Sequence, residues 1–342
     1  MDLIYMNHEM IDQGVLSGYE MDLAFGEDEN DFECLIPADA HCCQAGWYLY
    51  AEDTEYGGII DTLEVRSEAN EVVYFGRTWH GILGSKVVMP LTSSDTSTQH
   101  VTIKTADSAG VSLVGRYLVI SGDANRCIDF ILQRLGLSAM FQAPEGDAGA
   151  IVTGFQFDRF TDGYKGIVKM LSSVGLKMAV KYTNGKVIIG GVEKFDYSTD
   201  DEFDPSLVDI QLKKKVNAVN HLICLGSGEL EQRTVLHLYA DANGNISTTQ
   251  TQFGLDEYAA TYDYSSVESD EELMKKGIEQ LKKLWEPDEM VISLDAESDF
   301  FDVGDKVGAT DSITGLSCSA TIKKKIVKLR SDYTTINYEV GE

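Results

Sequence analysis

Basic residues are scarce in this sequence. It has 28 lysines and arginines against 56 aspartates and glutamates, so its formal net charge is −28. Proteins that bind nucleic acid or anionic membranes use Lys and Arg to neutralise phosphates. The excess of acid therefore excludes sequence-neutral DNA binding and docking on an anionic bilayer. It is compatible with a surface that nucleic acid must pass without sticking.

Long apolar runs are also missing. No stretch approaches the roughly 18 apolar residues of a membrane span. Residues 1–14 mix acids with apolar residues and have no basic start, so they do not form a signal peptide. We expect a protein that is made and kept in a cytosol, or released from it by lysis, with no membrane partner. Its 342 residues, 43% hydrophobic, suffice for about two to four domains.

Cysteine is sparse and lacks the paired spacing of metal sites. The best metal candidate is His41-Cys42-Cys43, with Cys34 upstream. Adjacent residues of a strand point to opposite faces, so three neighbours cannot all ligate one ion in regular structure. We therefore expect a packed or half-exposed cysteine pair, reduced thiols and no bound metal.

A second metal candidate has calcium-loop spacing. Asp295, Glu297 and Asp299 occupy positions 1, 3 and 5 of such a loop. Positions six and twelve would be Phe300 and Lys306, where the loop requires Gly and Glu. A solvated acidic turn is the favoured interpretation.

Recognisable catalytic motifs are absent from the sequence. Gly226-Ser227-Gly228 lacks the five-residue frame of a nucleophile elbow and indicates a turn. His80 follows Trp79 in an apolar stretch, which favours a hydrogen-bonded core residue over a general base. We predict that the chain has no catalytic, cofactor-binding or metal-binding residues and that the protein is not an enzyme.

Apolar periodicity predicts a mainly β fold with α+β insertions. Alternation of period two predicts a hairpin from Tyr19–Phe25 and Phe32–Ile36. The other predicted strands are 47–51, 59–66, 71–75, 219–225, 233–239, 290–294, 319–329 and 333–340. Helical spacing predicts helices near 124–135 and 162–174, stopped by Gly136 and Gly175, and a third near 270–285, capped by Ser269. A hairpin at 177–190 turns at Asn184-Gly185, and 196–205 reads as a linker.

Several segments together resemble one protein family. A strand ending in Gly76-Arg77-Thr78 leads into an apolar helical turn and then Pro90, as in tail proteins of phages and prophages of Gram-positive bacteria. The resembling segments are Glu55–Ile60, Tyr74–Leu83, Val216–Leu230 with its continuation to Asp241, and Phe301–Val307. Their order along residues 15–340 is similar to that of siphophage tail-tip proteins, akin to the baseplate hub or the N-terminal region of tail-associated lysins.

The resemblance implies a fold, an assembly and a location. It implies two tail-tube-like β-barrel domains, 1–90 and 205–342, around a central α+β region, 91–204. It also implies a homotrimeric ring that contacts the tail tube, the distal tail protein and other tip proteins. DNA would pass through this ring without specific binding. Such a protein is assembled in the bacterial host cytoplasm and carried in the virion.

Two alternatives stay open. The first is a cell-wall-degrading, tail-associated hydrolase, although the chain ends at Glu342 with no room for an appended hydrolase region. The second is a receptor- or carbohydrate-binding module of the tail tip, for which the 16 tyrosines are compatible but not specific.

Overall fold

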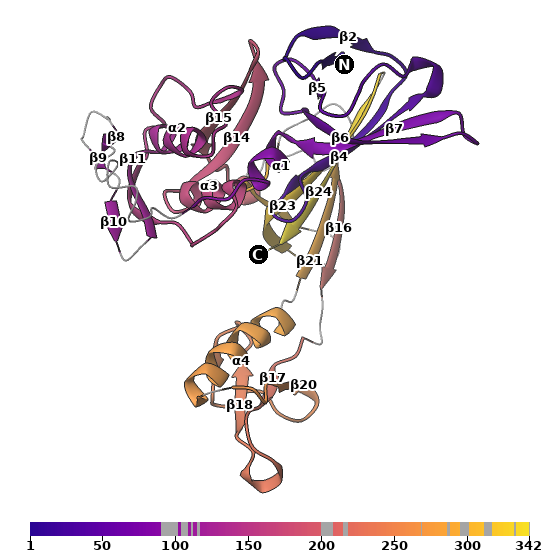
Figure 1. Ribbon diagram of the computed structural model, residues 1–342. Coiled ribbons are helices and arrows are strands. Elements are labelled where there is room, and N and C mark those ends of the chain that lie inside the picture. The colour runs from indigo at the N-terminus through magenta and orange to yellow at the C-terminus, as the bar shows by residue number, and fades with distance from the viewer. Residues whose placement is uncertain are drawn as a thin grey trace. The chain divides into compact units, whose positions relative to one another are not determined.

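The computed structural model describes residues 1–89, 102–103, 109–110, 112–114, 117–199, 208–214, 218–267, 269–285, 288–294, 301–310, 317–331 and 333–341. The chain forms two compact units. Unit 1 contains Met1–Gln211, Val291–Thr310 and Ser319–Glu342, and unit 2 contains Leu212–Met290 and Asp311–Cys318. Chain colouring in Figure 1 shows that both the first and the last residues belong to unit 1.

Unit 1 is organised around one large sheet. The strand order is β16-β21-β24-β23-β3-β4-β7-β6-β5-β1-β2, and β22 pairs with β23 outside this path. The strands are β1 (Leu3–Met6), β2 (Asp12–Leu16), β3 (Glu20–Gly26), β4 (Asp31–Pro37), β5 (Tyr48–Tyr50), β6 (Gly57–Arg66), β7 (Glu71–Thr78), β16 (Val208–Lys214), β21 (Asp288–Leu294), β22 (Lys306–Thr310), β23 (Ser317–Arg330) and β24 (Thr334–Gly341).

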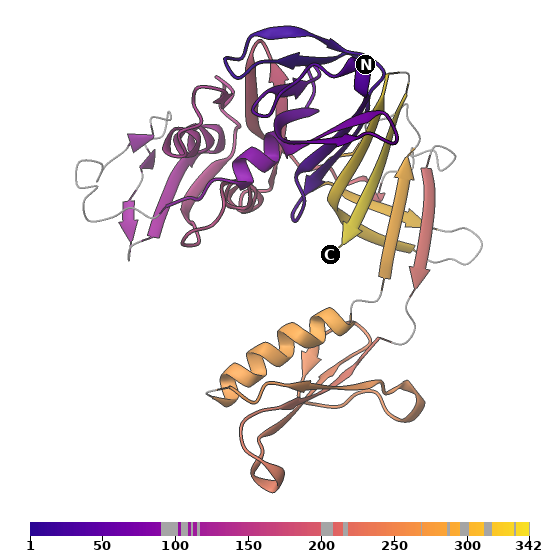
Figure 2. The ribbon, with the colours of Figure 1, turned by 45° about the vertical axis from the view of Figure 1, so that its right-hand side comes forward.

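The predicted β3–β4 hairpin is confirmed, with Met21 opposite Cys34 and Leu23 opposite Phe32. The sheet also joins the two ends of the chain, because β3 pairs antiparallel with β23 from Lys324 opposite Gly26 to Arg330 opposite Glu20. Figure 2 shows the yellow C-terminal strands beside the indigo N-terminal strands. No sheet closes into a barrel in the described part of the chain, so the two tube-like barrels stay a prediction.

The central part of unit 1 combines helices with short sheets. Its helices are α1 (Trp79–Gly84), α2 (Ala124–Arg134) and α3 (Gly163–Ser172), and 3-10 turns lie at Ala38–Ala40 and Tyr197–Thr199. Its strands are β8 (Thr102–Ile103), β9 (Ala109–Gly110), β10 (Ser112–Val114), β11 (Tyr117–Asp123), β12 (Phe141–Gln142), β13 (Ile151–Gln156), β14 (Leu176–Thr183) and β15 (Lys186–Glu193). These strands form sheets β8-β9, β10-β11-β13 and β12-β15-β14.

Local sequence signals set the ends of these elements. Asp123 caps α2 by accepting from the Asn125 amide at 2.9 Å, and Gly136 ends the helix with φ 71°. The predicted hairpin is confirmed as β14–β15, because Asn184 and Gly185 both have positive φ, 51° and 76°. The helices predicted near 124–135 and 162–174 are observed as α2 and α3.

One hydrophobic core joins the N-terminal strands to the central helices. The fully buried Trp79 ring of α1 stacks on Tyr182 of β14, with centroids 5.6 Å apart, and meets the edge of Phe141 at 6.4 Å. Burying an aromatic ring of this size removes a large apolar area from water. Residues of 1–89 and 117–193 therefore share one hydrophobic core.

Unit 2 is a four-stranded sheet covered on one face by a helix. The sheet has the order β19-β18-β17-β20, built from β17 (His221–Leu225), β18 (Val235–Ala240), β19 (Ile246–Ser247) and β20 (Ala259–Asp263), with 3-10 turns at Leu230–Gln232 and Gly254–Asp256. Leu222, Cys224 and Leu238 pack against Leu273 and Leu281 of α4 (Asp270–Trp285). The Glu272 amide donates to Ser269 Oγ at 3.2 Å, which confirms the predicted cap.

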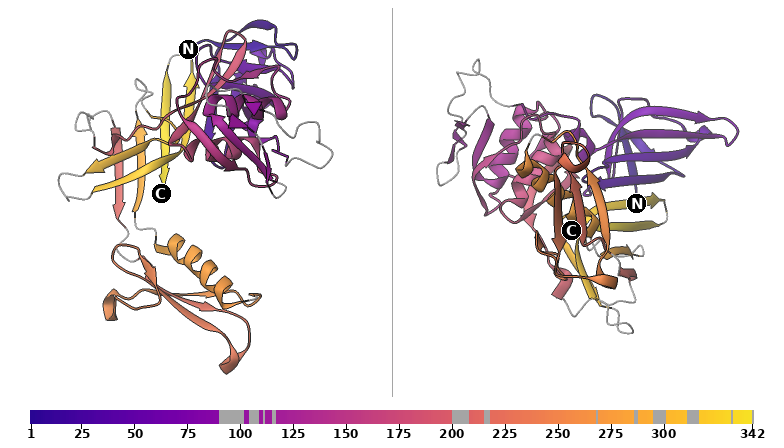
Figure 3. Two further views of the ribbon diagram at one scale, coloured as in Figure 1. Left: turned by 90° about the vertical axis from the view of Figure 1, so that its left-hand side faces the viewer. Right: turned by 90° about the horizontal axis from the view of Figure 1, so that it is seen from below.

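The compact units divide the chain differently from the predicted regions 1–90, 91–204 and 205–342. The third region contributes both to unit 1 and to unit 2. The physical reason is the long-range pairing of β3 with β23, together with the core around Trp79. Neither interaction can be read from local periodicity. The left panel of Figure 3 shows β-strands late in the sequence running beside the N-terminal ones.

Candidate functional site

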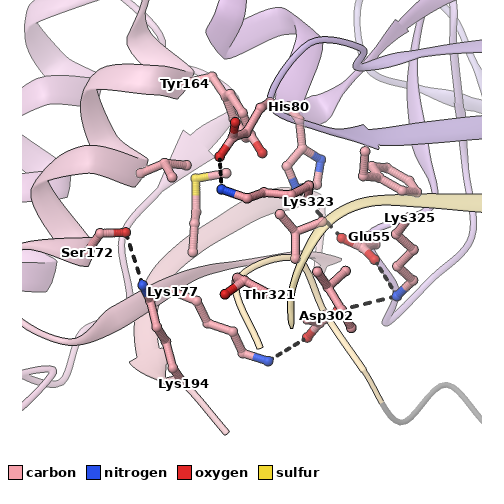
Figure 4. Close-up of a pocket in the computed structure, with 17 residues that line it drawn as sticks. Glu55, His80, Tyr164, Ser172, Lys177, Lys194, Asp302, Thr321, Lys323 and Lys325 are labelled. Atoms are coloured by element: carbon pink, nitrogen blue, oxygen red, sulfur yellow. Dashed lines mark hydrogen bonds and ion pairs between the residues drawn. The ribbon is translucent and has the colours of Figure 1, made fainter. Parts of the chain in front are cut away.

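The main concentration of buried charge in unit 1 is a set of six residues, which we name the ionic cluster. Its members are Glu55, His80, Lys177, Asp302, Asp305 and Lys325. They come from the segment between β5 and β6, from α1, from β14, from the turn before β22, and from β23. Five of them, all except Asp305, line a cavity of about 120 Å³, shown in Figure 4.

Two buried lysines supply the cations of the ionic cluster. Lys177 Nζ lies 2.6 Å from Asp305 Oδ2 and 3.2 Å from Asp302 Oδ2. Lys325 Nζ lies 2.8 Å from Glu55 Oε1 and 3.3 Å from Asp302 Oδ1. Asp302 therefore bridges the two lysines, as the dashed lines in Figure 4 trace. The lysine side chains are only 5% and 2% exposed, and their partners Asp305 and Glu55 are 0% and 16% exposed, so water screens these two pairs little. Asp302 is 45% exposed, so its two pairs are screened more.

Protein groups also hold the carboxylates of the cluster. Asp305 is fully buried, and its carboxylate accepts hydrogen bonds from the amides of Phe195 and Asp302, both at 2.9 Å. Burial alone would raise the pKa of Asp302, but the charges of Lys325 and Lys177 outweigh it and lower that pKa. Asp302 is therefore ionised at neutral pH. The cluster pairs two lysines with three acidic side chains.

His80 is the neutral member of the cluster. Burial lowers the pKa of His80 to about 3, while Asp302 opposes and Lys325 assists that shift. The ring lies between Phe25, at 5.0 Å, and Tyr164, at 5.8 Å. Its Nε2 is 3.6 Å from Glu55 Oε2. The sequence correctly placed His80 in the core, but its Nδ1 has no hydrogen-bond partner among the described residues, so it is not the fully hydrogen-bonded residue expected.

The ion pairs of Lys177 and Lys325 connect separate segments of unit 1, and we call this arrangement the clamp. Removing one partner of a buried ion pair leaves an uncompensated charge and typically costs about 3–5 kcal/mol. The clamp ties β14 and β23 to the segment that precedes β6. The cavity also contains a serine–lysine contact, because Lys194 Nζ donates to Ser172 Oγ at 3.2 Å. A lysine becomes a base when it is desolvated, whereas Lys194 is exposed.

The pairings within the ionic cluster could not be predicted from the sequence. Lys177 and Asp305 are 128 residues apart, and Lys325 and Glu55 are 270 apart. One local signal was present, because Lys325 shares the buried face of β23 with Val327 and Leu329. A lysine on the apolar face of a strand requires a buried partner. The turn Phe301–Val307, which carried part of the family resemblance, holds both aspartates.

The cysteine candidate forms a small hydrogen-bonded group. The Tyr74 hydroxyl lies 2.9 Å from His41 Nδ1 and accepts from the Cys42 and Cys43 amides at 3.3 Å. The two thiol sulfurs are 3.8 Å apart, with Cys43 buried and Cys42 half-buried, which matches the predicted packed pair. These residues follow a 3-10 turn rather than lying on a strand, so the opposite-faces argument does not apply to them.

Other sequence candidates can be located only in part. Among the described residues, no group of three or more His, Cys, Asp or Glu could hold a metal ion. Asp295, Glu297 and Asp299 lie outside those residues. Gly226-Ser227-Gly228 lies in the connection from β17 to β18, where Gly228 has φ 96°. None of the helices described is long and apolar enough to cross a membrane.

Comparison with known proteins defines the fold class. No family model and no curated protein matches the chain. Among solved structures, the tail protein from Neisseria meningitidis MC58 matches at 13% identity and TM-score 0.50, covering 100% of this chain and 96% of that one. The 43 kDa tail protein of prophage MuSo2 from Shewanella oneidensis matches at 10% identity and TM-score 0.50, covering 100% and 98%.

The chain therefore has the fold of phage tail proteins, and the resemblance predicted from the sequence is confirmed at the level of the fold. The similarity extends over both compact units, since it covers the whole chain.

Proposed function

We propose that this chain is a structural subunit of a phage or prophage tail tip. Three copies form a ring-shaped baseplate hub that joins the tail tube to the tip. It is assembled in the host cytoplasm and carried in the virion. The observation that carries the proposal is the extent of the structural match, which includes this entire chain and nearly all of two tail proteins. A shared fold over that length favours a shared structural role.

The ionic cluster and the Trp79 core support this role mechanically. A hub must transmit load between tube and tip without its parts shearing. Lys177 and Lys325 hold β14 and β23 through carboxylates of other segments. In the proposed ring, strands of 1–90 and 205–342 form the two tube-like barrels, and the β3–β23 pairing joins them.

The net charge of −28 fits a passage for DNA. Basic walls would bind phosphates by releasing counterions, whereas acidic walls repel them. We place part of the acidic surface along the central passage of the ring. The distal tail protein, the tail tube and other tip proteins are the proposed partners.

Negative-stain imaging and light scattering of the purified chain test the ring. The expected result is a particle with a central hole and about three times the 37.7 kDa mass of one chain. A chain that stays monomeric at every concentration, and also in the presence of tail-tube protein, would contradict the proposal.

The hydrolase alternative has one specific structural candidate, the Ser172–Lys194 contact. Because Lys194 is exposed, we expect no cleavage of bacterial peptidoglycan. Muropeptide release above a heat-inactivated control, lost in Ser172→Ala and in Lys194→Met, would establish the enzyme instead.

A further inference from the structure

Unit 2 contains a second cluster of titratable side chains, remote in sequence from the ionic cluster. His221 Nδ1 lies 2.6 Å from Glu257 Oε1, and His221 Nε2 lies 2.8 Å from His237 Nδ1. The Tyr239 ring stacks on His221, with centroids 4.3 Å apart. His221 is on β17, and His237 and Tyr239 are on the neighbouring β18.

Strand alternation puts this cluster on the open face of the sheet. Leu222 and Leu238 face α4 and form the core of unit 2. Side chains one position away point to the other face, which is where His221, His237 and Tyr239 lie. The His221 side chain is 9% exposed, whereas His237 is exposed to solvent. The pair therefore has one fixed ring and one accessible ring.

The hydrogen bonds define the state of the fixed ring. An ionised carboxylate only accepts, so His221 Nδ1 carries the hydrogen and donates it to Glu257. In the neutral tautomer with its hydrogen on Nδ1, His221 Nε2 has a lone pair that can accept a hydrogen bond from His237 Nδ1, 2.8 Å away. Histidines that ligate metals characteristically donate their other ring N–H to a carboxylate, which fixes the tautomer and raises the basicity of the ligating nitrogen.

We propose that His221 and His237 bind a divalent transition-metal ion of the Ni²⁺ or Zn²⁺ class, with Glu257 as the positioning residue. Imidazole nitrogens are preferred ligands for these ions. In the square-planar coordination that Ni²⁺ adopts, neighbouring nitrogens about 2.0–2.1 Å from the ion lie about 2.9 Å apart, and in the tetrahedral coordination of Zn²⁺ they lie about 3.3 Å apart. The nitrogens here are 2.8 Å apart.

Metal entry requires a small rearrangement at the accessible ring only. The ring of His237 turns so that its Nδ1 lone pair faces the ion. Its hydrogen moves to Nε2 by exchange with water, so no proton is lost overall. His221 keeps its hydrogen bond to Glu257 throughout. Water completes the coordination on the exposed side, because the described chain offers two imidazoles and not a closed cage.

Titration calorimetry with Ni²⁺, on the full chain after chelator treatment, tests this site. We expect one Ni²⁺ per chain and at least tenfold weaker binding in His237→Ala. Glu257→Gln should weaken binding about tenfold or more, since positioning partners usually contribute that much to metal affinity. His8→Ala is the matched control, because His8 is an exposed histidine on unit 1, and it should leave the affinity unchanged.

A second measurement separates this site from Ni²⁺ held by the thiols of Cys42 and Cys43. Paramagnetic Ni²⁺ should selectively broaden and shift the imidazole proton signals of His221 and His237. Binding that is equally tight in His237→Ala, or the absence of binding by the wild-type chain at millimolar Ni²⁺, overturns the proposal. Because His237 is exposed, circular dichroism of the His237→Ala chain should match the wild type and so exclude unfolding as the cause.

Discussion

Replacing His80 with Gln should remove a defined part of the protein's acid sensitivity. In the folded chain, burial lowers the pKa of His80 to about 3. In the unfolded chain the ordinary histidine value of about 6.5 applies. At a pH between these two pKa values, His80 is protonated in the unfolded chain and neutral in the folded chain. The stability of unit 1 therefore falls as pH decreases below about 6.5, and this contribution levels off near the folded-state pKa.

The magnitude follows from the two pKa values. Between about pH 7.5 and about pH 5, the preferential protonation of the unfolded state lowers the free energy of unfolding by about 2 kcal/mol. His80 stays neutral in the folded state throughout this window. Asp302 remains ionised there, since the charges of Lys325 and Lys177 outweigh the effect of burial and lower its pKa.

Urea unfolding followed by tryptophan fluorescence measures this effect. In a Trp285→Phe background, the signal comes from Trp47 and Trp79, which both belong to unit 1. The stability difference between the His80→Gln chain and its parent should shift by about 2 kcal/mol across the window, in favour of the variant at low pH. A change in unfolding free energy that comes from altered packing is the same at every pH, so it does not contribute to this shift.

The matched control is His8→Gln, which changes an exposed histidine of the same unit. It should leave the pH dependence as it is. If His80→Gln and the parent chain lose stability in parallel over the whole window, His80 titrates normally when folded, and the assignment of a buried, neutral ring is refuted.

Three further predictions concern the clamp, a turn and the assembly. Asp305→Asn removes the closer and fully buried carboxylate of the two that pair with Lys177, and it should lower the unfolding free energy by about 3 kcal/mol. Urea melts with an unchanged midpoint would argue against the clamp. Gly185→Val should lower the free energy of unfolding by about 1–2 kcal/mol, because φ at this position is 76° and a β-branched residue resists positive φ. Gly146→Val is the near-neutral control, because a side chain at Gly146 also enters open space. Equal melting temperatures of the two variants would contradict the turn assignment. The proposed trimer should assemble better as salt rises from about 0.01 M to about 0.15 M, since screening relieves repulsion between chains of charge −28. It should not retard DNA on a gel. Sedimentation that shows the strongest assembly at the lowest salt would refute this role of the charge.

Local signals in the sequence predicted the elements better than their partnerships. Gly136 and Gly175 mark the ends of α2 and α3, and both have positive φ. Ser269 caps α4, as its spacing from Glu272 indicated. The strands β1 and β2 were missed, because Asp12–Leu16 includes Gly14 and shows no clear alternation. The ionic cluster could not be predicted, because Lys177 lies 128 residues from Asp305 and Lys325 lies 270 residues from Glu55.

The acidic character follows from composition alone. The sequence by itself also determined the strand alternation, the capped helices and the Asn184-Gly185 turn, because each of these depends on residues a few positions apart. It also carried the tail-protein resemblance, which the fold confirms. Only the tertiary structure decided that β23 pairs with β3, that Lys177 and Lys325 share Asp302, and that His221 meets His237 across two strands. Side chains on separate segments meet only when the backbone of the whole unit is placed, and burial then lowers the pKa of His80 and keeps its ring neutral.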